Sequence, residues 1–416
     1  MGSGIALLPA SLAKIGSVAI WGWIIAAIGA LSLAYVFARL ATNNPQTGGP
    51  IAYAGEVAPI FGHQTSILYY HANWIGNLAI AITAVAYLSV FFPVLNNPVP
   101  AAITSIAMVW LFTFVNLLGG AWVSRLTSIG LVLVLIPVVG TALFGWGSFD
   151  IEVYRQNWMA QPDGNVHQAV INSVLLCLWA FVGVESAAVS SDLVHNPSRT
   201  VPLATLGGTA LAGIVYIAAS QVIAGMFPNE VVANSGAPFA LSASRIVGDW
   251  AAPFVSAFTA IACLTSLGSW MMLVGQAGRR AAMDGNFPAV FGETDNNGVP
   301  KKGLLIASTM MSILMVLLTI LSASGSNAAD LFTQLTSIAV LLTMFPYFYS
   351  AIDLIRFESA TSKSILSLIA SAFAMLFCFA ALAGAEHYEI TATIIISLLI
   401  FAFYARKLGG IQHKNI

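Results

Sequence analysis

Long apolar segments recur along almost the whole of this chain. Each is close to the length of about 20 residues that an α-helix needs to cross the hydrocarbon core of a membrane. Only 7% of the residues are charged and 58% are hydrophobic, whereas soluble domains carry about 25% charged residues. The sequence therefore predicts an all-α, polytopic membrane protein. Its eleven expected spans lie near residues 18–41, 64–92, 100–120, 126–147, 167–190, 201–227, 250–276, 303–323, 330–355, 362–384 and 388–407.

A shorter apolar stretch, residues 1–10, precedes the first full span. At about 1.5 Å of rise per residue it covers only about half of a bilayer. We therefore expect the chain to begin inside a helix whose first half is missing from this sequence.

Lysine and arginine residues predict the orientation of the spans. If the end after the span at 18–41 is cytoplasmic, twelve basic residues face inside and three face outside, which is the asymmetry that positive-inside topology requires. We therefore expect a cytoplasmic C-terminus. The outer residues are Lys14, Arg155 and Arg245; the inner ones are Arg39, Arg125, Arg199, Arg279, Arg280, Lys301, Lys302, Arg356, Lys363, Arg406, Lys407 and Lys414.

Several other classes of function are disfavoured by the sequence. The net charge is -1 and no basic stripe or phosphate-binding loop is present, so we expect no nucleic-acid partner. Cys177, Cys263 and Cys378 lie in apolar runs, which argues against disulfides and cysteine-rich metal sites. No nucleophile motif or metal-ligand spacing is found either. We expect neither a cofactor nor an enzyme.

Glu185 is the only acidic residue near the middle of a long apolar segment. A charged group at bilayer depth is costly and rare, and it usually faces a cavity or a substrate path. Gly183 lies two residues earlier, where a helix need not stay regular. These features favour a transporter, with residues 1–407 as a single transmembrane transporter domain and 408–416 as a short cytoplasmic tail.

Two glycine-containing segments show a weak internal similarity, as in a sequence repeat. Gly2-Ser3-Gly4 in the first half-span resembles the segment around Gly183, about five spans later and with opposite direction through the membrane. Paired interrupted helices of this kind build the substrate site of inverted-repeat transporters, because unwound backbone exposes N–H and C=O groups at the midplane. The alternative is that these glycines only allow helices to pack closely.

Aromatic and amide side chains could complete a site for an ammonium group. Trp179 precedes Gly183 by one helical turn, and Trp270 follows a run of small residues at similar depth; indole faces bind cations. Tyr69, Asn73 and Asn77 fall on roughly one face of the span at 64–92. The alternatives are packing or belt tryptophans and a polar stripe that bonds to neighbouring helices.

Six segments carry a resemblance to a known family, and the similarity runs from the first residue to the last. The chain resembles the basic amino acid/polyamine antiporters of the amino acid–polyamine–organocation superfamily, most strongly those that exchange cadaverine and lysine. The segments are Met1–Ala10, Asn44–Ala54, Leu68–Asn77, Leu178–Ala187, Asn196–Pro202 and Ser266–Trp270.

This resemblance implies a twelve-helix fold with two inverted five-helix repeats, broken helices 1 and 6, and two extra C-terminal helices. It implies a secondary antiporter of the bacterial inner membrane that takes up external lysine, releases internal cadaverine and contributes to acid resistance. Homodimers are common in such antiporters. A proton-coupled symporter, or an exchanger of arginine/agmatine or ornithine/putrescine, stays open as an alternative. A channel or a membrane-embedded enzyme is disfavoured, because neither filter motifs nor paired catalytic residues are found.

The resemblance also implies roles for individual residues. Glu185 would couple substrate to protons, since burial favours the neutral form of a carboxyl group and a bound cation favours the ionised form; a structural hydrogen bond is its alternative. For Asp284, an ion pair with Arg279 or Arg280 is the alternative. The implied substrate-binding set is Gly2, Ser3, Gly4, Tyr69, Asn73, Asn77, Trp179, Gly183, Glu185 and Trp270. The implied proton-coupling or gating set is Glu185, Tyr53, Tyr70, Tyr216, Asp284 and Tyr404.

Overall fold

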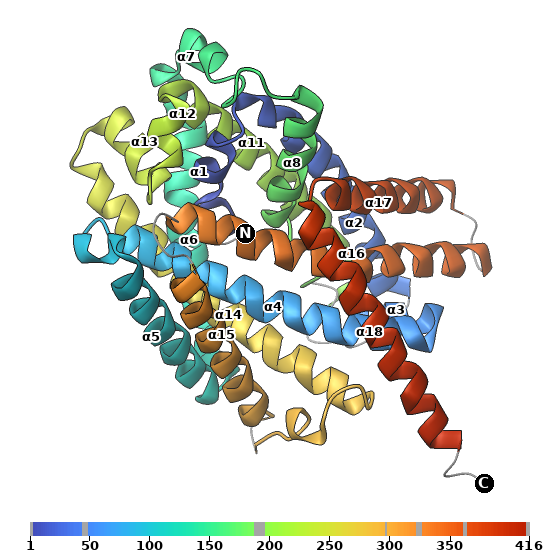
Figure 1. Ribbon diagram of the computed structural model, residues 1–416. Coiled ribbons are helices and arrows are strands. Elements are labelled where there is room, and N and C mark those ends of the chain that lie inside the picture. The colour runs from blue at the N-terminus through green and yellow to red at the C-terminus, as the bar shows by residue number, and fades with distance from the viewer. Residues whose placement is uncertain are drawn as a thin grey trace.

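The computed structural model describes residues 3–43, 49–186, 196–295, 298–321, 327–360 and 364–412. Every regular element in these ranges is a helix, as the sequence predicts (Figure 1). Gly2, Lys363 and Lys414 lie outside the described residues, so the structure says nothing of their predicted roles.

Within these ranges, ten long helices make up most of the structure. They are α2 (Ile20–Asn43), α4 (Pro59–Leu88), α5 (Pro98–Leu117), α6 (Gly120–Phe144), α11 (Gly208–Met226), α14 (Ala251–Met283), α15 (Lys301–Leu321), α16 (Ala328–Ala360), α17 (Ile365–Ala383) and α18 (His387–Gln412). Shorter helices connect or interrupt them: η1 (Ser3–Ile5), α1 (Leu8–Ala13), η2 (Ser17–Ala19), α3 (Pro50–Val57), η3 (Pro93–Asn96), η4 (Gly145–Ser148), α7 (Ile151–Gln156), α8 (Val166–Trp179), α10 (Pro197–Pro202), η6 (Leu203–Gly207), α12 (Asn229–Ala233), α13 (Pro238–Val247) and η7 (Ala289–Phe291).

The eleven expected spans correspond to helices of the structure. Within the described ranges, nine helices are long and apolar enough to cross a membrane, and α8 is a shorter apolar helix. The remaining span is α4, which is 30 residues long and carries buried polar residues such as Gln64, Asn73 and Asn77. It packs mainly against α14 and α16. Because α4 is surrounded by protein, its polar side chains face other helices instead of lipid.

Both predicted helix interruptions are found, and they lie against each other. Helix η1 ends before α1 begins, and α8 ends at Trp179 before a run of turns that continues to Glu185. A Cβ atom built on Gly4 would lie 3.4 Å from Cα of Ala180, so the two broken segments touch through backbone. The inverted relation between the two halves of the chain stays a prediction.

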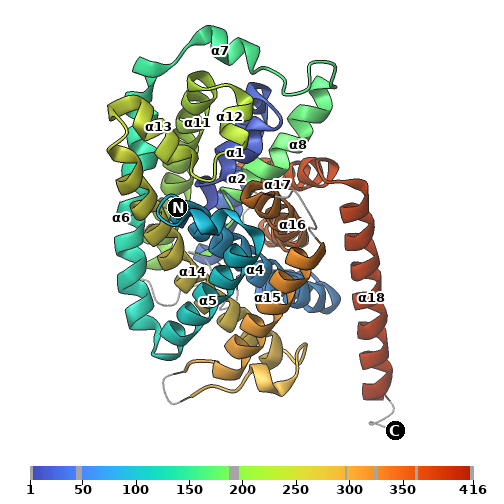
Figure 2. The ribbon, with the colours of Figure 1, turned by 60° about the vertical axis from the view of Figure 1, so that its left-hand side comes forward.

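Short helices cover one end of the bundle. Helices α7, α12 and α13 gather there, and the C-terminus lies at the other end (Figures 1 and 2). Asn157, just after α7, holds this cover together: its side-chain amide donates to the carbonyl oxygens of Ala224 and Phe227, and its Oδ1 accepts from the backbone N–H of Asn229. The span analysis does not predict these short helices, because they lie outside the apolar segments.

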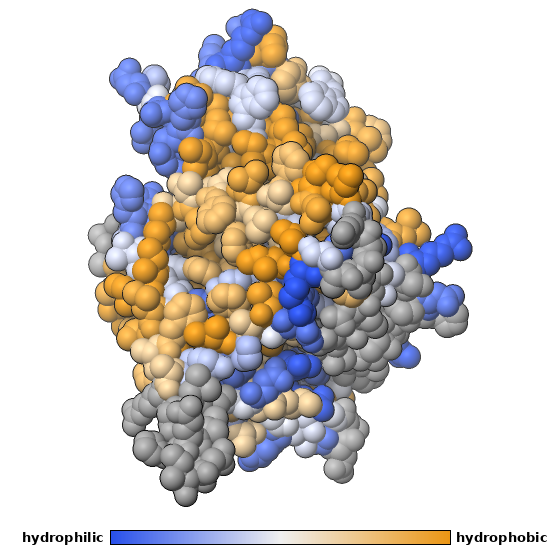
Figure 3. Space-filling model, turned by 90° about the vertical axis from the view of Figure 1, so that its right-hand side faces the viewer, coloured by the Kyte–Doolittle hydropathy of each residue, from blue (hydrophilic) through white to orange (hydrophobic). Residues whose placement is uncertain are grey.

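The outer surface suits a bilayer. The face shown in Figure 3 is mainly hydrophobic in its upper half, with hydrophilic residues at its upper edge and again lower down. Helix α18 lies along the outside of the bundle (Figure 2) and exposes large apolar side chains, among them Ile395, Leu398 and Phe403. It continues to Gln412, past residue 407 where we place the end of the transmembrane domain.

Candidate functional site

Glu185 lies at the interruption that follows α8, and its side chain is completely buried. The Tyr69 hydroxyl of α4 donates to Oε1 at 2.9 Å, and the Tyr347 hydroxyl of α16 donates to Oε2 at 2.6 Å. The backbone N–H of Gly183 also donates to Oε2, at 3.1 Å. The carboxyl group therefore joins three parts of the chain: α4, α16 and the break itself. Among the described residues it forms no ion pair, so all three of its partners are neutral donors.

Gly183 allows the chain to turn beside this carboxyl group. Its φ angle is +105°, a conformation that residues with a Cβ atom rarely adopt. A Cβ atom at this position would also lie 3.1 Å from Cζ2 of Trp270. The indole of Trp270, on α14, therefore packs directly on the turn. Both the backbone angle and the close approach of this ring require glycine.

Trp179 is the last residue of α8, directly before the break. Its ring reaches α4, because a Cβ atom on Gly76 would lie 2.9 Å from Cη2 of the indole. Its Nε1 lies 3.7 Å from the Cβ position of Gly4, in the first broken segment. This N–H group is buried and has no hydrogen-bond partner. A buried donor without a partner is costly, so it is available to an acceptor that enters between the two breaks.

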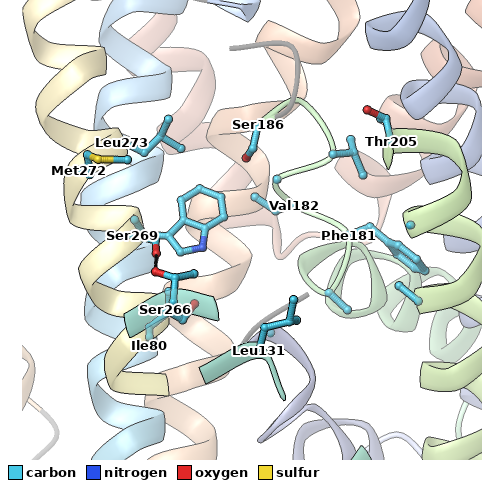
Figure 4. Close-up of a pocket in the computed structure, with 18 of the residues that line it drawn as sticks. Ile80, Leu131, Phe181, Val182, Ser186, Thr205, Ser266, Ser269, Met272 and Leu273 are labelled. Atoms are coloured by element: carbon cyan, nitrogen blue, oxygen red, sulfur yellow. Dashed lines mark hydrogen bonds between the residues drawn. The ribbon is translucent and has the colours of Figure 1, made fainter. Parts of the chain in front are cut away.

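A cavity of about 1080 Å³ adjoins the break. Its walls are the turn after α8, α6, the η6–α11 segment and α14, with Gly4 and Tyr69 contributing as well. Figure 4 shows Ser266, Ser269 and Leu273 on one side and Phe181, Val182 and Ser186 on the other. Tyr69 and Gly183 line the cavity, whereas Glu185 and Tyr347 do not. The carboxyl group thus lies directly behind the wall of the cavity.

The cavity runs along α14 towards one end of the molecule. It extends from Ser266 and Trp270 to Arg279, Arg280 and Met283 at the C-terminal end of this helix. The positive-inside analysis places this end on the cytoplasmic side. The chamber therefore extends from the broken helices towards the predicted cytoplasmic face.

Four predicted residues of α3 and α4 are buried but lie outside the cavity wall. The Asn73 side chain donates back to the Tyr69 carbonyl oxygen at 2.7 Å. The Asn77 amide has no hydrogen-bond partner at either end. Tyr53 packs against Phe37 in a ring contact, and Tyr70 packs against Phe287 and Phe291. Of the predicted polar stripe, only Tyr69 reaches both the cavity and Glu185.

The remaining predicted residues are dispersed. Tyr216 lines the cavity and packs against Trp23 and Phe181. Asp284 accepts from Nε of Arg280 at 2.9 Å, which is the ion pair that the sequence analysis gives as its alternative role. Tyr404, on α18, contacts the His63 ring, away from the cavity wall. Ser3 belongs to η1, but its side chain lies outside the described atoms.

Two features of the site are missed by the sequence analysis. Tyr347 binds Glu185 from a position 162 residues later in the chain, and nothing local distinguishes it from the other tyrosines. Thr205 lines the cavity from η6, a single π-helical turn. A signal for this turn exists: Pro202 stands inside the preceding helix, and a proline there removes a backbone donor and disturbs the regular pattern. Single π-turns are frequent at functional sites.

Known proteins match this chain over nearly its whole length. The family model described as amino acid permease matches residues 1–405. The chain belongs to the amino acid permease family. It is 68% identical to the cadaverine/lysine antiporter of Escherichia coli (strain K12), over 100% of this chain and 94% of that protein. It is 34% identical to the putrescine transporter PotE of Haemophilus influenzae, over 84% of this chain and 79% of the relative.

A second putrescine transporter PotE, from Escherichia coli (strain K12), is 31% identical over 100% of this chain and 94% of its own length. The resemblance to the amino acid–polyamine–organocation superfamily is therefore confirmed. Family membership and the nine apolar helices within the described ranges identify this amino acid permease as a multi-pass membrane protein.

Proposed function

We propose that this permease is a secondary antiporter that exchanges external lysine for internal cadaverine. The observation that carries the proposal is the 68% identity to a cadaverine/lysine antiporter across every residue of the chain. The residues that we assign to the site lie within this matched length. The putrescine transporters, at 31% to 34% identity, are more distant.

The chemistry of the site supports a small cationic substrate. An ammonium group at membrane depth needs carbonyl oxygens, aromatic faces or a carboxylate. The cavity offers the indoles of Trp179 and Trp270 together with the turn at Gly183. Glu185 lies behind this turn and is bound only to neutral donors. We propose that a bound ammonium group draws the ionised carboxylate towards the cavity and that its departure returns the carboxyl group to Tyr69 and Tyr347.

The proposed exchange transfers charge. Lysine carries a net charge of about +1 and cadaverine about +2 near neutral pH, so each cycle would export one positive charge. Lysine decarboxylation inside the cell consumes a proton, and the exchange would then remove acid from the cytoplasm. We therefore propose an inner-membrane protein with a cytoplasmic C-terminus that contributes to acid resistance.

Counterflow in proteoliposomes tests the proposal. Vesicles that contain the purified chain are loaded with cadaverine, and uptake of labelled lysine is compared with uptake into empty vesicles. We expect uptake only into loaded vesicles. Uptake should be faster when the vesicle interior is made less negative by a few tens of millivolts, because each cycle moves net positive charge out of the vesicle. Uptake into empty vesicles driven by a pH gradient would instead indicate the symporter. Preference for internal putrescine or agmatine would reassign the substrate pair.

A further inference from the structure

The short helix α1 is attached to α16 at its outer end. The ammonium group of Lys14 pairs with Oδ1 of Asp330. Three residues before Lys14 and three residues after Asp330, the Thr333 hydroxyl donates to Oγ of Ser11 at 2.8 Å. These contacts join parts of the chain that are more than 300 residues apart in sequence. They lie at the end of α1 that leads to the short covering helices, since Ala160, after α7, donates to the carbonyl oxygen of Ile15.

Asp330 is held in place for this contact. Its Oδ2 accepts from the backbone N–H of Asn327 at 3.1 Å, and its own N–H donates to Oδ1 of Asn327 at 3.0 Å. Oδ1 of Asp330 is left for Lys14. The Lys14 and Asp330 side chains are 34% and 35% exposed, and neither residue lines the cavity. The pair therefore faces the outside of the molecule and is separate from the chamber.

Both helices of this contact also reach the substrate site. Helix α1 follows η1, the first broken segment, whose Gly4 lies against the second break. Helix α16 carries Tyr347, which binds Glu185. Tyr347 lies seventeen residues after Asp330, a rise of about 25 Å along the helix. From the break, the cavity runs along α14 in the opposite direction, to Arg279 and Met283. Helix α1 packs against α8, α11 and α12 as well as α16.

We propose that the Lys14–Asp330 pair, together with the Ser11–Thr333 hydrogen bond, is an outer latch that holds α1 against α16 and keeps the site closed to the outside. The latch must open before a substrate can enter from that side. Ion pairs between partly exposed groups are weak, so a change in one shifts a conformational equilibrium by about two- to five-fold instead of locking it. The proposal rests on the proposed exchange only in requiring a site that opens alternately to the two sides.

Thiol labelling from outside tests the latch without any substrate. Ser186 lines the cavity, so a Ser186→Cys chain reports when the cavity opens. The three native cysteines are buried, and the chain without Ser186→Cys gives their background. A membrane-impermeant maleimide is added to the outer face of right-side-out vesicles, and the labelling rate is measured. Labelling after solubilisation in detergent, and elution as a single species in gel filtration, show that each variant is folded.

Breaking the latch is expected to speed external labelling. Lys14→Ala and Asp330→Asn should each raise the rate about two- to five-fold, and the double exchange Lys14→Asp with Asp330→Lys should return it towards the parent rate. The matched control is Arg155→Ala, which removes an exposed ion pair with Glu152 within α7 on the same outer end; its rate should equal that of the parent.

Equal labelling rates in all folded variants would overturn the latch and leave the proposed exchange untouched. The latch would also be overturned if the double exchange changed the labelling rate by as much as the two single changes combined, because the effect would then not come from the pair. Failure of lysine/cadaverine counterflow with a clear labelling difference would overturn the proposed substrates and retain the latch.

Discussion

At the scale of single residues, Glu185 is notable for what binds it. Its two carboxyl oxygens accept from two phenol hydroxyls and one backbone N–H. Charged groups deep in a membrane protein are usually paired with an opposite charge, and within the described residues this one has no such partner. We therefore propose that Glu185 supplies the anion of a cation–anion pair and that a cationic substrate supplies the other member.

Replacement of Glu185 by glutamine tests this role. Glu185→Gln keeps the size of the side chain and can still accept from Tyr69, but it removes the negative charge. We expect cadaverine affinity to fall about 10- to 100-fold, because hydrogen bonds to charged groups contribute about 1.5–3 kcal/mol. Equilibrium binding of labelled cadaverine to the purified chain measures this change. The control is Glu152→Gln on the exposed helix α7, and unaltered binding in Glu185→Gln would exclude the carboxyl group from the site.

Trp179 allows a separate test of the aromatic wall. Trp179→Leu keeps an apolar side chain but removes the indole face and the buried Nε1–H. We expect cadaverine binding to weaken by about 1–2 kcal/mol, the range for a partly desolvated cation–aromatic contact. The same binding assay applies, with Trp146→Leu as the control because that residue is 50% exposed in η4, just after α6. Equal affinities in both variants would assign Trp179 to packing.

At the scale of elements, the two broken segments depend on a few positions with unusual geometry. The turn after α8 reverses at Gly183, and Trp270 of α14 packs on that turn. Helix α4 contributes Tyr69 to the same place, and α16 contributes Tyr347. Three helices thus direct a side chain to this one turn. The break is therefore the part of the fold to which the site is most sensitive.

Gly183→Ala tests how much the break depends on its backbone. The φ angle of +105° and the 3.1 Å approach of Trp270 both oppose a Cβ atom, and strain of this kind costs about 1–3 kcal/mol. We expect a lower thermal unfolding temperature in detergent and a loss of counterflow. Gly140→Ala in α6 is the control, since a Cβ atom there meets nothing within 4 Å. A variant with unchanged unfolding and transport would show that the turn tolerates ordinary residues.

At the scale of the whole molecule, the chamber between α6, α11 and α14 extends from the broken helices towards the predicted cytoplasmic side, and we propose it as the substrate path. Gly208 lines this chamber, whereas Gly207 does not, and a Cβ atom on either meets nothing within 4 Å. Substitutions at these two neighbouring glycines can therefore distinguish an obstructed chamber from a damaged fold.

A leucine at each of these glycines makes the comparison. Gly208→Leu should place about four carbon atoms in the chamber and reduce the rate of lysine/cadaverine counterflow at least about ten-fold, since a rigid obstruction in a translocation path slows every cycle. Gly207→Leu should transport like the parent. Both variants should unfold at similar temperatures, because a Cβ atom at either position meets nothing within 4 Å. Equal transport by the two variants would show that substrate does not pass this wall.

Much of this arrangement is predictable from the sequence, because the signals are local. Apolar length predicts the spans, and the isolated acid at Glu185 beside Gly183 predicts a break next to a cavity. The partners of that acid are not predictable in the same way. Tyr347 reaches it only because α16 packs beside α4 and α8, and the spacing of residues along one helix does not show which other helices pack against it. The short helices around Asn157 are missed for a different reason: they lie outside the long apolar segments from which the spans are predicted.

Helix α4 has a consequence for how the protein is made. Its Gln64, Asn73 and Asn77 are covered by α14 and α16 in the finished fold, and those helices begin at Ala251 and Ala328, long after α4 has left the ribosome. Polar side chains make spontaneous partition of a lone helix into lipid unfavourable. During synthesis α4 must therefore be retained by the insertion machinery or by its early neighbours, α3 and α5, until its later partners arrive.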